Sequence, residues 1–114
     1  MLLAASGCGK NFWKAKVHLL KAEDDYSKAY QLKYKKVPYE MRLKYYGSAC
    51  RHYKKVYHSN SSLFTLNRIW EAADACFRIE DLEGREEFLE FEEKYVKEHP
   101  TEAEYGDAVP INID

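Results

Sequence analysis

The stretch from Ala4 to Asn11, AASGCGKN, places a thiol and a lysine among small residues. A glycine-rich loop ending in Gly-Lys can wrap a phosphate in backbone N–H groups, in the pattern G-x-x-x-x-G-K-[ST]. Gly9 and Lys10 match, but Ala4 replaces the first glycine and Asn11 replaces the hydroxyl that would hold magnesium. No apolar run that would supply a supporting strand precedes Ala4. The stretch therefore does not predict nucleotide binding.

The same stretch presents Cys8 directly after Ala5, Ser6 and Gly7. This order resembles the lipobox of bacterial lipoproteins, in which the cysteine carries lipid with acyl chains such as palmitate. The resemblance implies lipid attachment at Cys8, at the end of a lipobox-like segment covering residues 1–10. A complete signal needs roughly 7 to 15 apolar residues after a basic region, so this interpretation places the natural start upstream of Met1. The alternative is a chance match, which leaves Cys8 as a free thiol.

Composition is that of a single globular domain. The 114 residues are 46% hydrophobic and 32% charged, and no run of about 18 apolar residues predicts a membrane span. Cys50 and Cys76 show no spacing suited to zinc. They could pair in an oxidising compartment or remain as two small buried residues, and the sequence leaves this open.

Hydrophobic periodicity is helical almost throughout and predicts an all-α fold. The loops are short, so four to five helices should lie antiparallel, as TPR-like hairpins or a small bundle. We expect a helical domain over residues 11–100 and a tail over 101–114. The expected helices span about 11–36, 38–58, 63–79 and 85–98. Acidic residues at 23–25 interrupt the first of them. One of Asn60, Ser61 and Ser62 is expected to cap the third.

Each expected helix has an apolar face. In the first helix the acidic residues 23–25 interrupt this face near its middle. The predicted inward residues are, in order along the chain, Trp13, Val17, Leu20, Tyr26, Ala29, Tyr30, Tyr34 and Val37; Tyr39, Leu43, Tyr46, Cys50, Tyr53 and Tyr57; Leu63, Leu66, Ile69, Trp70, Ala73, Cys76 and Phe77; and Phe88, Leu89, Phe91, Tyr95 and Val96.

An internal similarity links residues 50–57 to residues 88–95 at an offset of 38. With small residues at Ala72–Ala73 and an aromatic helix that ends before Pro100, the region from Glu71 to Pro100 resembles tetratricopeptide-type repeats. The offset exceeds the roughly 34 residues of that family, so the pattern is TPR-like. The resemblance implies helical hairpins that bind a peptide or a helix. An ordinary four-helix bundle is the alternative.

Charge is strongly divided along the chain, although the net charge is −1. From Lys28 to His58 there are nine basic residues and one acid, and from Glu71 to Asp107 four basic residues and fourteen acids. Such blocks form solvated helix faces or contact a partner of opposite charge. The basic block contains no nucleic-acid-reading motif, so we expect no nucleic-acid partner.

No arrangement of residues predicts catalysis. The four histidines, His18, His52, His58 and His99, show no i, i+4 ligand pair and are expected on exposed helix flanks. The many carboxylates of residues 86–93 are neighbours on one helix. We therefore expect a non-enzymatic protein with no metal and no cofactor.

These observations together predict a membrane-anchored helical scaffold or adaptor that binds another protein. The lipobox resemblance implies a periplasmic-side anchor in a bacterial envelope, at the inner or the outer membrane, and accessory subunits of envelope complexes are the implied class. The alternative is a cytoplasmic helical bundle that self-associates through its oppositely charged halves. The predicted partner-binding residues are Arg42, Tyr45, Arg51 and Lys55. They are expected to lie on the second helix and to face away from the core, and Tyr and Arg concentrate binding energy at interfaces.

Overall fold

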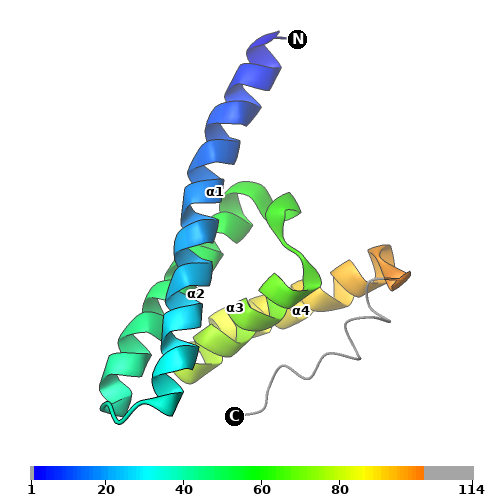
Figure 1. The fold of residues 1–114 in the computed structure, drawn as a ribbon. Coiled ribbons are helices and arrows are strands. Elements are labelled where there is room, and N and C mark those ends of the chain that lie inside the picture. The colour runs from blue at the N-terminus through cyan, green and yellow to red at the C-terminus, as the bar shows by residue number, and fades with distance from the viewer. Residues whose placement is uncertain (1, 102–114) are drawn as a thin grey trace.

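The computed structural model describes the backbone of residues 2–101 and the side chains of residues 12–101. Over that range the chain is all-α, with four α-helices and no strand, which confirms the predicted fold class. Helices α1 and α2 form one antiparallel hairpin and α3 and α4 a second, which packs at an angle against α2, while the N-terminal end of α1 projects beyond the rest (Figure 1). The helices are α1 (Leu2–Gln31), α2 (Tyr39–Asn60), α3 (Leu66–Arg78) and α4 (Leu82–Glu98), with 3₁₀ turns at Leu32–Tyr34 and Ser61–Leu63.

A seam of small side chains joins α1 to α2. Among residues 12–31 of α1, the buried apolar residues recur at alternating spacings of four and three, which is the heptad pattern of two helices that pack along their length. Three of the five are alanines, so the two backbones can approach closely. The seam consists of Ala15, Leu19, Ala22, Tyr26 and Ala29 on α1, and Tyr46, Ala49, Tyr53 and Val56 on α2.

The predicted inward face of α1 is wrong over its N-terminal half. Trp13, Val17 and Leu20 are 67%, 64% and 56% exposed, and Tyr34 is exposed as well. The prediction gave weight to large apolar side chains, whereas close packing of the hairpin selects alanines on the opposite side of the helix. Only Tyr26 and Ala29 of the predicted set are fully buried.

The acidic residues 23–25 do not break α1, because the last of them, Asp25, is buried inside the α1–α2 hairpin with partners for its carboxylate. Asp25 is buried, and its carboxylate accepts a hydrogen bond from Ser48 Oγ at 2.5 Å. The Nζ of Lys21 lies 3.2 Å from the other carboxylate oxygen. A buried carboxylate with both partners is tolerated, and α1 continues to Gln31 before the chain tightens into a 3₁₀ turn.

Helix α3 starts at Leu66, three residues later than predicted. Phe64 and Thr65 are extended, and the Thr65 hydroxyl caps the helix by accepting the Arg68 N–H at 3.3 Å. The aromatic rings of Tyr57, Phe64, Phe88 and Phe91 then pack together between the hairpins, with the Tyr57 and Phe91 centroids 4.8 Å apart. All predicted inward residues of α4 pack in or against the core, but Phe77 of α3 is 51% exposed.

The turn between α3 and α4 is held by Asp81. Its carboxylate accepts the Gly84 N–H at 3.0 Å, which caps α4, and it receives the Lys54 ammonium of α2 at 2.8 Å. The Lys54 ammonium, followed by that N–H, holds the pKa of Asp81 below its usual range. Before the turn, Glu80 occupies the left-handed region at φ 62°, where glycine is favoured. The turn is thus fixed both to its own helix and to α2.

A disulfide joins Cys50 of α2 to Cys76 of α3, beside Asp81. The Cα atoms are 5.0 Å apart, and both cysteines are buried. This pairing resolves the alternative that the sequence left open. The bond ties the second hairpin to the first at one end of α3.

Reduction of this disulfide should lower the free energy of unfolding. The bond closes a loop with a sequence separation of 26 residues, and the chain-entropy relation gives about 3.5 kcal/mol for such a loop. We expect the urea midpoint of the Cys8→Ala chain, followed by circular dichroism, to fall on addition of dithiothreitol. The Cys50→Ala/Cys76→Ala form of that chain serves as control and should be insensitive to the reductant. Equal midpoints for the untreated and reduced Cys8→Ala chain would show that the two thiols are unpaired in solution.

Candidate partner-binding cleft

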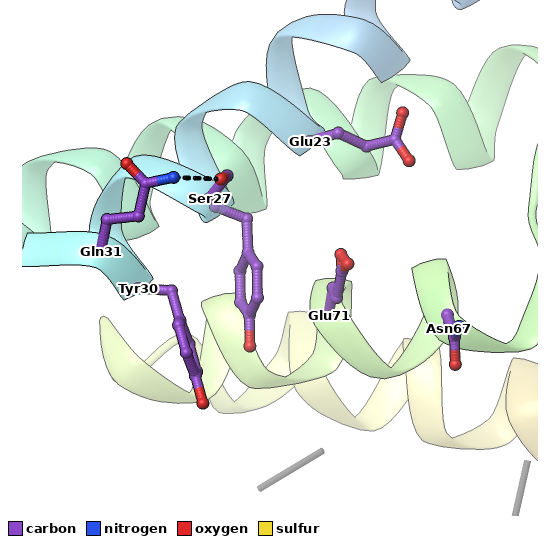
Figure 2. A pocket seen from close by; sticks show the side chains of 7 residues that line it. Glu23, Ser27, Tyr30, Gln31, Asn67 and Glu71 are labelled. Carbon is purple, nitrogen blue, oxygen red and sulfur yellow. Dashed lines mark hydrogen bonds between the residues drawn. The ribbon is translucent and has the colours of Figure 1, made fainter. Parts of the chain in front are cut away.

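An open cleft of about 450 Å³ separates α1 from α3, the first helices of the two hairpins. Figure 2 shows Glu23, Ser27, Tyr30 and Gln31 on the α1 side, and Asn67 and Glu71 on the α3 side. Tyr26 completes the lining. The cleft exists because α1 packs closely only on α2, while α3 is held to α2 by the disulfide and diverges from α1 along its length.

Two polar bridges span the cleft and set its width. The Tyr26 hydroxyl donates to Asp74 Oδ2 at 2.8 Å, and the Arg68 guanidinium Nε lies 3.0 Å from Glu23 Oε2. Both bridges join α1 to α3. Because each uses a long side chain, the helices stay apart between them and the groove remains open.

The cleft is acidic, and one of its carboxyls is strongly perturbed. Burial, followed by the nearby Glu23 carboxylate, raises the pKa of Glu71 to about 7. The Tyr53 hydroxyl, whose oxygen lies 3.5 Å from Glu71 Oε2, donates to Glu71 and opposes that shift in part. Burial also raises the pKa values of Tyr26 and Tyr53 well above the usual range. At neutral pH the cleft therefore combines the neutral Tyr26 hydroxyl with a carboxyl, Glu71, that readily gains or loses a proton.

A second cleft, of about 500 Å³, lies between α1 and α2 and is basic. At its edge the Nδ1 atoms of His18 and His52 are 2.9 Å apart, so one ring donates to the other. Partial burial, then Lys55 for His18 and His18 for His52, lowers both pKa values. The expectation that both lie on exposed flanks is wrong, since both are half-buried. The lining residues are Lys14, His18, Lys54, Lys55, His58 and Ser59.

The four predicted partner-binding residues occupy two environments. Arg51 and Lys55 are exposed on α2, and Lys55 lines the basic cleft. Arg42 is half-buried, with its Nε donating to the Ala29 carbonyl at 3.1 Å, and Tyr45 packs against the core with Lys28 over its ring. Arg42 and Tyr45 thus hold α2 on α1, and partner binding by the four residues stays a prediction.

The residues of the acidic cleft were missed by the sequence-based prediction. They come from two helices that are about 40 residues apart in the sequence, and no local sequence pattern predicts that these residues lie together. Cys8 belongs to the helical backbone of α1, but its side chain lies outside the described residues, so lipid attachment stays a prediction.

Among the described residues, one group has the ligand types of a metal site. Ligand atoms of Cys50, Cys76 and Asp81 lie within 4.8 Å of one another. Because metals bind thiolates and both sulfurs are in the disulfide, the oxidised chain does not offer this group as a site. Nor is any described helix long and apolar enough to cross a membrane.

Comparisons with protein-family models, with curated proteins and with solved structures gave no match to this chain. The lipoprotein and TPR-like resemblances therefore stay expectations.

The raised pKa of Glu71 makes folding stability depend on pH. A carboxyl whose folded pKa, about 7, exceeds its ordinary value of 4.5 binds more protons in the folded state between those values. Stability from this group therefore falls as pH rises through that window and is constant above it. Glu71→Gln should remove this fall, so the variant gains on the order of 2 kcal/mol relative to the native chain between about pH 5 and about pH 8.

Urea unfolding of both proteins across that range measures the difference and cancels the opposite contributions of His18 and His52. The matched control is Glu86→Gln on the exposed side of α4, which should follow the native curve. A constant difference between Glu71→Gln and the native chain at all pH values would contradict the perturbed carboxyl.

Proposed function

We propose that this protein is a non-enzymatic helical adaptor, held at a bacterial envelope membrane through a lipid on Cys8, that binds another protein. The observation that carries the proposal is the open cleft between α1 and α3. Its mixture of tyrosine rings, amides and carboxyls suits a peptide or helix with a basic side chain, because both rings and carboxylates attract cations. The chain itself contains such a cation–ring contact, because Lys33 Nζ lies 4.8 Å from the centre of the Tyr30 ring.

The disulfide supports the envelope location. Disulfides between buried cysteines persist in oxidising compartments such as the bacterial periplasm and are rare in the reducing cytosol. Cys50 and Cys76 are both buried and paired. A periplasmic position is also what a lipid on Cys8 implies.

Self-association through opposite charges receives less support. Part of the opposite charge is paired within the chain, where the Lys54 ammonium of α2 lies 2.8 Å from the Asp81 carboxylate. Those groups are less able to recruit a second copy. The adaptor is therefore the function that the geometry favours.

Anchoring is tested by expressing the gene with its natural upstream region in a bacterium. We expect the native protein to stay in the membrane fraction after a high-salt wash, because an acyl chain inserts independently of charge. Cys8→Ala should be released by the same wash, and Cys50→Ala/Cys76→Ala, which retains Cys8, should remain. If native protein and Cys8→Ala partition alike after the wash, the lipid anchor is wrong.

Partner binding is tested by photo-crosslinking in the same cells. A benzoylphenylalanine at Tyr30, inside the cleft, should give a discrete crosslinked protein band, because a bound segment passes within reach of that ring. The same photoprobe at Tyr39, an exposed tyrosine of α2 outside the cleft, is the matched control and should give none. A band from a probe at Lys55 with none from Tyr30 would overturn the cleft and favour the exposed face of α2.

A further inference from the structure

Helix α1 carries a second apolar stripe that no described part of the chain covers. Trp13, Val17 and Leu20 are spaced by four and three residues and are each more than half exposed. At about 100° per residue they lie nearly opposite the alanine seam that packs on α2. Three large apolar side chains on one line of a helix are costly to leave in water, at roughly 25 cal/mol per Å².

Lysines border this stripe on both sides. By helical position Lys16 lies along one edge, and Lys14 and Lys21 along the other; Lys14 and Lys21 are exposed and Lys16 is half-exposed. No acidic residue occurs between Phe12 and Ala22. The stripe ends one turn beyond Leu20, at the exposed carboxylate of Asp24. An apolar centre with cationic edges is the pattern of a helix that lies in the surface of a bilayer, where lysine stems follow the apolar surface and ammonium groups reach the headgroups.

The charges argue against a second copy of this chain as the occupant. Two α1 helices facing each other through this stripe would place lysine edge against lysine edge in either orientation. Three side chains also cover much less than the roughly 800 Å² per partner of a stable protein interface. An anionic lipid surface offers both the apolar layer and the complementary charge, with about 1 kcal/mol per lysine near the surface.

We propose that the outer face of α1 binds an anionic lipid surface, with Trp13, Val17 and Leu20 below the headgroups and Lys14, Lys16 and Lys21 beside the phosphates. The inference rests on the membrane location of the proposed function but not on the lipid at Cys8. It supplies a second attachment to the membrane, beside the lipid proposed at Cys8. The acidic cleft begins at Glu23, beyond the stripe, so the two surfaces occupy successive segments of α1.

The test uses the full chain as Cys8→Ala, which carries no lipid, and vesicles of phosphatidylcholine with or without phosphatidylglycerol. The chain contains only two tryptophans, so a Trp70→Phe form reports Trp13 alone. We expect co-sedimentation with the anionic vesicles and a blue shift of Trp13 emission, with little of either for phosphatidylcholine alone. Circular dichroism of each variant verifies that it is folded.

Two variants and one control separate the contributions. Val17→Asp should weaken partitioning at least about tenfold by placing a charge in the apolar layer, and Lys14→Glu/Lys16→Glu, which leaves the Lys21–Asp25 ion pair intact, should weaken it at least about tenfold on anionic vesicles. Met41→Asp alters an exposed apolar side chain on α2 and should partition like the parent chain.

Three results would overturn the proposal. The first is no partitioning of the folded chain into anionic vesicles, and the second is partitioning that ignores both the lysine reversal and the lipid charge. The third is a dimer in the absence of lipid that Val17→Asp dissociates, which would assign the stripe to a second copy. Failure of Cys8 anchoring in cells leaves the vesicle result unaffected, so the two proposals fail separately.

Discussion

The close contact between α1 and α2 is the interaction on which the rest of the structure depends. Alanines at positions 15, 22 and 29 recur every seven residues and bring the two backbones together along most of α2. Both candidate binding surfaces lie on other faces of α1: the acidic cleft faces α3 and is spanned by two polar bridges, and the lysine-edged stripe lies on the outer side.

Polar and covalent links then decide where the second hairpin sits. The Cys50–Cys76 disulfide and the Lys54–Asp81 ion pair hold one end of α3 and the following turn on α2. From that fixed end α3 diverges from α1. The Tyr26–Asp74 and Glu23–Arg68 bridges set the distance between the two helices, so the cleft between them stays open. The cleft is thus a consequence of fixing α3 to α2 at one end, and burial there raises the pKa of the Glu71 carboxyl.

Periodicity predicted the helices because their apolar residues recur at three and four. It failed at the start of α3, where the cap formed by the extended Thr65 places the first helical residue at Leu66. The acidic cleft was beyond prediction, since Glu23 and Glu71 meet only through the hairpin packing. The disulfide was foreseeable as one of two alternatives, because spacing in the sequence carries no information on the distance between α2 and α3.

The prediction that Trp13, Val17 and Leu20 face inward was wrong for a physical reason. A protein core and a bilayer surface select the same large apolar side chains, so Trp13, Val17 and Leu20 satisfy a helical period whichever they face. A face toward a bilayer differs from a face toward a protein core in the charge of the residues along its edges and in the size of the residues on the opposite side of the helix. Lysines on both borders suit a lipid surface, and alanines on the far side mark the seam against a neighbouring helix. A helix with two apolar stripes, one small and one large, therefore has its core on the small one.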